Sequence, residues 1–220
     1  MATRKSQRIG IWVIAIALTI GTLGSFAVMV LATQNSAQTQ ARLKELSTQY
    51  KKATDEYQAK LDAQAAELSK HYFAEFSQYA GRPGMFERDG VKTLASEDLK
   101  TGDGTALGKD ATFAAYYIGW TPNGKVFDSS IKDGALKAPI TAAPGGVIKG
   151  WTKGVEGMKV GGVREITIPS DDAYGEQGQG DTIPPNTPLK FVIMVVPTPP
   201  TIPQPEVPKE LMDYYKAGVQ

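Results

Sequence analysis

The run Ala111–Ser130, ATFAAYYIGWTPNGKVFDSS, predicts the centre of the fold. Its first half, which ends at Trp120, is rich in aromatic and apolar residues and is typical of a β-strand. The next four residues, 121–124, have turn chemistry, because an Asn-Gly pair tolerates the positive φ angles of a tight turn. The chain then resumes as a strand at residues 125–128. We therefore expect two short strands joined by a turn.

The flanking sequence predicts more short strands and one internal helix. Residues 138–142 and 163–168 are expected to be strands. A final half-buried strand is expected at the alternating apolar positions Leu189, Phe191, Ile193 and Val195. The helix is indicated by apolar residues three or four apart, Ile148, Trp151, Val155 and Met158. The prediction is an α+β fold in which an antiparallel sheet wraps one short helix.

The composition excludes several kinds of chemistry. The net charge of +1 over 220 residues argues against a nucleic-acid partner. The chain has no cysteine and one histidine, His71, so disulfides, thiol catalysis and cysteine- or histidine-based metal sites are excluded. The adjacent carboxylates Asp171 and Asp172 are expected to be solvated loop residues. No nucleophile elbow, phosphate loop or dinucleotide fingerprint occurs. We expect no metal and no cofactor, and an apolar cleft in place of reactive groups.

Five blocks of residues, taken together, resemble one known family. They are residues 116–119 (YYIG), 123–130 (NGKVFDSS), 146–151 (GVIKGW), 154–161 (GVEGMKVG) and the pair 173–175 (AYG) with 183–191 (IPPNTPLKF). Each block alone is a weak signal, but their order and spacing over residues 90–197 are specific. The chain resembles the FKBP family of peptidyl-prolyl cis/trans isomerases.

The resemblance implies a twisted half-barrel of five or six antiparallel strands around the short helix, and a site for a substrate proline. The residues implied to bind substrate, with Trp151 as the floor, are Tyr117, Phe127, Val147, Ile148, Trp151, Ala173, Tyr174, Ile183 and Phe191. Three catalytic roles are also implied. The Ile148 amide and the Tyr174 hydroxyl are implied to donate hydrogen bonds to the carbonyls of the bound ligand. Asp128, at the rim, is implied to accept a hydrogen bond from a polar group of the ligand.

The sequence departs from the family pattern near Asp128. Relatives often have an arginine that pairs with this aspartate, whereas this chain offers Lys132, which cannot form a bidentate pair. Many relatives also have an aromatic residue where Ala138 or Pro139 stands, and some have histidine at Gln179. The missing aromatic favours an alternative, a non-catalytic membrane-tethered module that holds proline-containing partners. A general chaperone that acts through its helical stalk is a third hypothesis.

An apolar segment near the N-terminus predicts a membrane anchor. The 24 residues Ile9–Ala32 carry no charge. As a helix, a segment of this length is long enough to cross a hydrocarbon core of about 30 Å. Basic residues precede the segment at Arg4, Lys5 and Arg8, so residues 1–8 are expected in the cytoplasm and the rest of the chain outside it. A cleavable signal peptide is the alternative, although its apolar region is usually only about 7–15 residues long.

The remaining segments complete the predicted domain organisation. Residues 33–80 are expected to form a long helical stalk, either solvated and docked through Phe73, Phe76 and Tyr79 or paired in a weak coiled-coil homodimer. The isomerase domain is expected at 81–197. A proline-rich tail follows at 198–220, with one short helical turn at 210–216. The predicted function is isomerisation of proline-containing exported polypeptides at the outer face of a bacterial cytoplasmic membrane.

Overall fold

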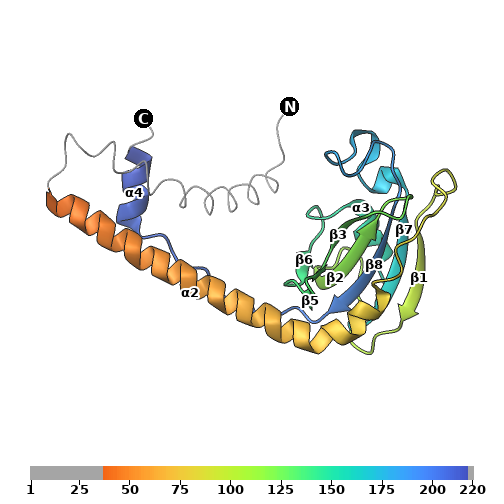
Figure 1. The fold of residues 1–220 in the computed structure, drawn as a ribbon, viewed down its shortest axis with the longest axis horizontal. Helices are drawn as coiled ribbons and strands as arrows, with labels where there is room; N and C mark the ends of the chain where they lie inside the picture. The colour runs from red at the N-terminus through yellow and green to blue at the C-terminus, as the bar shows by residue number, and fades with distance from the viewer. Residues whose placement is uncertain (1–36, 218–220) are drawn as a thin grey trace. The chain divides into compact units, whose positions relative to one another are not determined.

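The computed structural model describes residues 37–217 of the chain. Two compact units are distinguished within them (Figure 1). One unit comprises residues 62–200, and the other comprises residues 37–61 together with residues 201–217. The long helix α2, Ala37–Phe76, contributes residues to both units.

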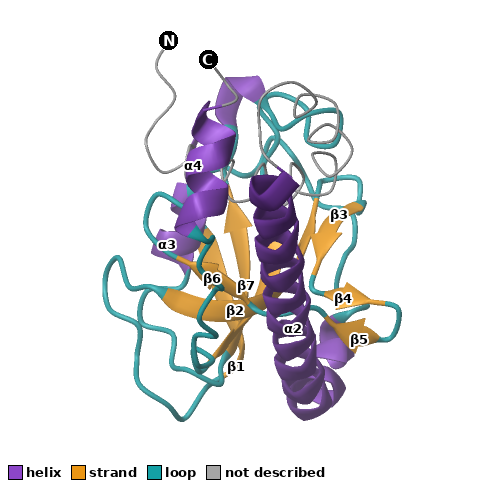
Figure 2. Cartoon of the chain, turned by 90° about the vertical axis from the view of Figure 1, so that its left-hand side faces the viewer, coloured by secondary structure: helices purple, strands orange, loops and turns teal. Residues whose placement is uncertain are grey.

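The larger unit is built on a six-stranded antiparallel sheet (Figure 2). Its strands are β1 (Ala95–Lys100), β2 (Phe113–Trp120), β3 (Val126–Ser129), β6 (Ile140–Ala142), β7 (Val163–Ile168) and β8 (Leu189–Val196). The order across the sheet is β1-β7-β8-β2-β3, and β6 also pairs with β2. The short helix α3, Lys149–Gly154, packs against one face. The predicted combination of antiparallel sheet and short helix is confirmed.

Side chains from both faces of the sheet are buried. Because successive residues of a strand point to opposite faces, β2 and β8 each contribute to two cores. On the α3 side, Phe113, Phe191 and Ile193 join Trp151 in one cluster. On the opposite side, the alternate residues of the same strands belong to a second cluster: Ala114, Tyr116, Ile118, Trp120, Val192, Met194 and Val196. The prediction that the last strand is half-buried was wrong, because β8 is covered on both faces.

The C-terminal end of α2 contributes to the second core. Phe76 is completely buried there, and Tyr72, Phe73 and Tyr79 pack around it. Tyr79 ends a short 3₁₀ turn, η1 (Ser77–Tyr79), that directly follows α2. The expectation that aromatic residues of the stalk dock on the globular domain is confirmed. The stalk helix therefore supplies part of the core of the larger unit.

A small hairpin at residues 131–136, which was not predicted from the sequence, also belongs to this unit. Strands β4 (Ile131–Lys132) and β5 (Ala135–Leu136) pair with each other. The turn between them has positive φ at both residues, 50° at Asp133 and 75° at Gly134, which suits a two-residue hairpin. The Leu136 amide donates to the Ser69 hydroxyl of α2 at 2.8 Å, and both residues are buried. This bond fixes the hairpin to the helix.

Strand β1 is the other element missing from the prediction. Its sequence, ASEDLK, is largely exposed. Since only one of its faces meets the protein and its residues are mostly polar, it has no apolar alternation to reveal it. It is formed by backbone pairing with β7 and by the Arg164 guanidinium, which donates to Asp98 at 2.6 Å from Nε and at 3.2 Å from Nη2. Long-range pairing therefore creates this strand.

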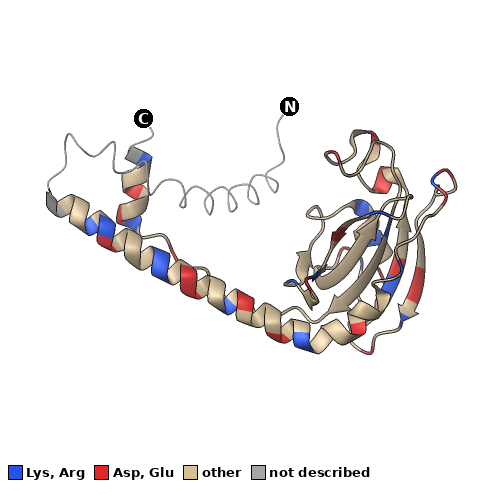
Figure 3. Ribbon diagram, viewed as in Figure 1, with Lys and Arg blue, Asp and Glu red and all other residues tan. Residues whose placement is uncertain are grey.

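The smaller unit joins the first part of α2 to a second helix, α4 (Lys209–Ala217). Leu46 of α2 and Leu211 of α4 are both buried, and Arg42 pairs with Glu210 at 3.3 Å. The short helix expected at 210–216 is therefore present. Charges of both signs follow one another along α2 (Figure 3), including the Lys51–Asp55 and Lys52–Glu56 pairs four residues apart, so much of the helix surface is polar.

Among residues 37–217, no helix combines the length and apolar character needed to span a bilayer. The predicted N-terminal segment 1–8 and membrane helix 9–32 lie outside the described residues.

Candidate functional site

Four aromatic rings from four elements form one cluster on the α3 side of the sheet. The Trp151 ring meets Phe191 nearly edge-on, with centroids 5.3 Å apart, and meets Tyr117 in the same manner at 5.1 Å. Phe127 lies edge-on to Phe191 at 5.5 Å. Such edge-to-face pairs are favourable because the positive ring edge meets the negative face. The four rings thus support one another in fixed orientations.

The strand periodicity and one glycine position these rings. Tyr117 on β2 and Phe191 on β8 lie on the same face, and Gly119, also on β2, pairs directly with Phe191. A Cβ atom on Gly119 would lie 2.6 Å from the Phe127 ring and 2.6 Å from the Phe191 ring. Glycine is therefore required at this position, because its missing side chain is the space that the two rings occupy.

Helix α3 approaches the sheet equally closely. A Cβ atom on Gly150 would lie 2.3 Å from Cγ2 of Ile168 on β7. The close approach places Trp151, which is only 3% exposed, beneath the partly exposed residues Val147 and Ile148. Ile148 is the N-cap of α3, with extended backbone at φ −62° and ψ 150°. Its amide makes no hydrogen bond to any of residues 37–217.

The loop between β7 and β8 brings the remaining predicted residues to the same cluster. Ile183 is buried, and Ala173 and Tyr174 are half-buried against it. Backbone bonds hold this loop closed, from the Gln179 amide to the Ile183 carbonyl at 2.8 Å and from the Asn186 amide to the Gly175 carbonyl at 2.8 Å. Apolar side chains and two short 3₁₀ turns, η2 (Ser170–Asp172) and η3 (Gly175–Gln177), thus form one wall of the site.

Asp128 lies at the edge of the cluster and is held by three donors. The Tyr117 hydroxyl donates to one carboxylate oxygen, and the Ser129 amide donates to the other at 2.7 Å. The Lys137 ammonium lies 3.3 Å from that second oxygen. Burial opposes ionisation of this carboxyl, but the hydrogen bonds from Tyr117 and Ser129 and the charge of Lys137 together lower the pKa of Asp128. Asp128 is therefore a carboxylate at neutral pH.

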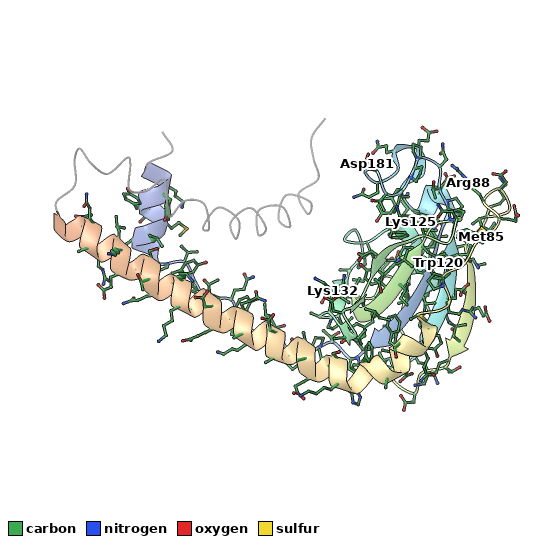
Figure 4. All side chains as sticks on the ribbon, in the orientation of Figure 1. Met85, Arg88, Trp120, Lys125, Lys132 and Asp181 are labelled. Atoms are coloured by element: carbon green, nitrogen blue, oxygen red, sulfur yellow. The ribbon has the colours of Figure 1, made fainter. Side chains whose placement is uncertain are left out.

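Lys137, and not Lys132, is the lysine that pairs with this aspartate. Lys132 is on β4 (Figure 4), in the hairpin that follows Asp128. The hairpin reverses the chain, and the Lys137 amide donates to the Ser130 carbonyl at 2.8 Å. This backbone bond places Lys137 beside Asp128. The sequence analysis did not predict a role for Lys137, because that role depends on the hairpin turn at Asp133-Gly134, which was not predicted either.

The two tyrosine hydroxyls of the site differ in their partners. Tyr117 donates to Asp128, and burial, this hydrogen bond and the aspartate charge all raise its pKa. The Tyr174 hydroxyl forms no hydrogen bond with any of the described residues, 37–217. Burial and then the Asp128 charge raise the pKa of Tyr174, so its hydroxyl keeps its proton at neutral pH. Tyr174 and the Ile148 amide are thus two donors free to bind a ligand.

All the residues predicted for the site come together in the structure. The buried floor consists of Trp151, Phe191 and Ile183, and half-buried apolar groups surround it. Asp128, Tyr174 and the Ile148 amide supply polar atoms. The arrangement contains an ionised acceptor and two neutral donors around aromatic surface. It provides binding and hydrogen bonding to a largely apolar substrate group.

Comparisons with known proteins identify the family. Residues 104–196 match the family described as FKBP-type peptidyl-prolyl cis-trans isomerase. An FK506-binding protein of Neisseria meningitidis serogroup A is 45% identical over 101 residues, which is 46% of this chain and 92% of that protein. The chain belongs to the FKBP-type peptidyl-prolyl cis-trans isomerases, and it is a peptidylprolyl isomerase (EC 5.2.1.8).

Two further matches extend over more of the chain. A probable FKBP-type peptidyl-prolyl cis-trans isomerase of Haemophilus influenzae is 37% identical over 133 residues, 60% of this chain and 52% of that protein. The crystal structure of a peptidyl-prolyl cis-trans isomerase from Pseudomonas syringae pv. tomato is 30% identical, covers 60% of this chain and 92% of that chain, and has a TM-score of 0.42.

Proposed function

We propose that this isomerase acts on proline-containing polypeptides exported across a bacterial cytoplasmic membrane, at whose outer face the segment Ile9–Ala32 anchors it. Support for the location comes from the sequence, namely 24 uncharged residues preceded by Arg4, Lys5 and Arg8. Polypeptides that have just crossed the membrane are unfolded, and their Xaa–Pro bonds populate both isomers. An anchored isomerase would meet them at this stage.

The site chemistry fits the rotation of a prolyl amide. Resonance gives the peptide bond a rotation barrier of about 18–20 kcal/mol. In the twisted transition state this resonance is lost, and the carbonyl is less polar than in the planar amide. Water stabilises the planar form better, so an apolar surface favours the twisted one. The observation that carries the proposal is the cluster of Tyr117, Phe127, Trp151 and Phe191, which offers the prolyl ring such a surface.

We assign the polar groups by their donor and acceptor properties. The Ile148 amide and the Tyr174 hydroxyl are free donors, and each is suited to a substrate carbonyl. Asp128 is an ionised acceptor at the edge of the cluster and is suited to a polar hydrogen of the substrate. Hydrogen bonds that strengthen as the amide twists would add to the effect of desolvation.

The catalytic proposal is tested on the full chain in detergent micelles with a Xaa-Pro test peptide. Wild type is expected to accelerate cis/trans exchange, and Phe127→Ala and Asp128→Ala are expected to lower kcat/KM while the protein remains folded. FK506, the ligand in the name of the Neisseria relatives, is tested as a competitor for the same site. Variants that match wild type would remove Phe127 and Asp128 from the mechanism.

The main alternative is a module that holds proline-containing partners without isomerising them. The observation that favours it is the absence of an aromatic side chain at Ala138 or Pro139, next to Lys137 and the Asp128 pair. This alternative predicts saturable binding of the test peptide with no change in its exchange rate. Binding and exchange are therefore measured on the same sample.

The location is tested in intact cells and in spheroplasts. An added protease is expected to cleave the chain in spheroplasts but not in intact cells, and deletion of residues 9–32 is expected to release the protein from the membrane fraction. A chain that stays protected in spheroplasts would refute the outward orientation. The alternative of a weak homodimer through the stalk is tested separately, by sedimentation of the full chain in detergent micelles.

A further inference from the structure

We propose that Lys153 and Asp172 form a clamp that positions the Tyr174 hydroxyl relative to the Ile148 amide. The two residues join the helix that carries one donor to the loop that carries the other. They are positioning residues, and neither is assigned a contact with substrate. The inference rests on the proposed roles of Tyr174 and Ile148 as the donors to substrate carbonyls.

The pair has a close and symmetric geometry. The Lys153 ammonium donates to both carboxylate oxygens of Asp172, at 2.8 Å and 2.9 Å. The Asp172 side chain is 19% exposed, whereas that of Lys153 is 58% exposed. The aspartate is therefore largely enclosed by protein and the lysine closes over it from the solvent side. The prediction that Asp172 is a solvated loop residue was wrong, because its side chain is mostly buried and paired with Lys153.

Each partner lies close in sequence to one of the two donors, so the pair links the element of one donor to that of the other. Lys153 is in the last turn of α3, whose N-cap is Ile148, and Asp172 ends the 3₁₀ turn η2, two residues before Tyr174. Among residues 37–217, these two bonds are the only side-chain hydrogen bonds between α3 and residues 170–174. The remaining contact between them is apolar packing, which is not directional. The ion pair is therefore the directional side-chain contact that relates this part of the loop to the helix.

The backbone bonds of residues 170–173 are local and do not reach α3, so they do not relate this turn to the helix. The Asp172 amide donates to the Pro169 carbonyl and the Ala173 amide to the Ser170 carbonyl, both within the same turn. Ala173 then has φ −111° and ψ −116°, outside the regions of helix and strand. The clamp holds the residue before Ala173, and Tyr174 follows immediately after.

The clamp is expected to affect catalysis more than stability. An ion pair whose lysine is mostly exposed contributes little to folding, since water screens its charge. Misplacement of a catalytic group by about 1 Å lowers rates by up to about a hundredfold. Loss of the clamp is therefore expected to lower kcat/KM by about fivefold or more, mainly through kcat, with little change in melting temperature.

The test compares four variants of the full chain in detergent micelles. Lys153→Ala and Asp172→Asn remove the pair, Lys153→Arg preserves its charge and reach, and the exchange Lys153→Asp with Asp172→Lys reverses it. Lys51→Ala is the matched control, because it removes a pair of similar length, 2.8 Å to Asp55, on the exposed surface of α2. For each variant kcat, KM, peptide affinity and melting temperature are measured.

The expected pattern is specific to a positioning role. Both single removals lower kcat, and the arginine variant and the charge exchange restore it, whereas the control equals wild type. If the removals leave kcat unchanged in folded protein, or if neither rescue restores it, the clamp proposal is refuted while the proposed function stands. A wild type that neither binds nor isomerises the peptide refutes the proposed function and the clamp together.

Discussion

Substituting Gly119 by alanine tests the packing on which the site depends. The added Cβ atom would lie 2.6 Å from Cζ of Phe127 and 2.6 Å from Cε1 of Phe191, where ordinary contacts begin at 3.4 Å. Each ring would have to move by about 0.8 Å to restore such a contact. Phe191 is 3% exposed and is held by Trp151, so it has little freedom to move. Phe127, at the half-exposed edge, is expected to move outward.

The size of the effect follows from this crowding. Adding one carbon to a filled core costs about 1–3 kcal/mol of unfolding free energy. A displacement of Phe127 by nearly 1 Å removes part of the surface that binds the prolyl ring, and is expected to lower kcat/KM by about tenfold or more. The activity loss should therefore exceed what the small loss of folded protein explains.

The assay combines urea unfolding with cis/trans exchange of a Xaa-Pro peptide. Gly108→Ala is the matched control, because a Cβ atom there meets no heavy atom within 4 Å. The control is expected to stay within about 0.5 kcal/mol of wild type with unchanged kcat/KM. If Gly119→Ala is as stable and active as Gly108→Ala, the tight packing of Phe127 and Phe191 against the strand is refuted.

Three further predictions concern ionisation and the second core. Because the pKa of Asp128 is lowered from 3.8 and that of Tyr174 is raised from 10.0, kcat/KM is expected to be constant from about pH 5 to 9. It should fall at more acidic pH, where Asp128 takes up a proton, and at pH above about 10, where Tyr174 loses its proton; a titration near pH 6–7 would contradict this. Lys137→Met removes a charge that lowers the Asp128 pKa, so the acid limb of the same profile should move to higher pH, and an unmoved limb would mean that the ammonium is not close to the carboxylate. Phe76→Ala should cost about 3–5 kcal/mol in urea unfolding, against less than about 0.5 kcal/mol for the exposed Met85→Ala, and equal losses would contradict the docking of α2.

The docking of α2 also changes how the domain should be delimited. A boundary at residue 81 separates Phe76 and Tyr72 from the strands that bury them. Both residues lie in the compact unit that comprises residues 62–200. A fragment that starts at 81 is therefore expected to expose Tyr116 and Met194 on the second face of the sheet, and a fragment for solution work should include α2.

The sequence alone was sufficient for the features that depend on local periodicity. The strands around Phe113–Trp120 and Leu189–Val196 were predicted from apolar content and alternation, because a strand presents every second residue to the same side. The turn at Asn123-Gly124 follows from the same kind of local rule, and Gly124 has φ 79°. The motif blocks identified the family, since their order along the chain needs no coordinates.

Other features were decided only by the tertiary structure. Whether Lys132 or Lys137 reaches Asp128 depends on the reversal of the chain at Asp133-Gly134. The role of Gly119 as space for two rings depends on Phe127 and Phe191, which come from different strands. The second core and the Lys153–Asp172 pair likewise join elements far apart in the sequence. Periodicity reports which way a residue faces along its own element, whereas these contacts depend on how separate elements meet, and only packing of the whole domain determines that.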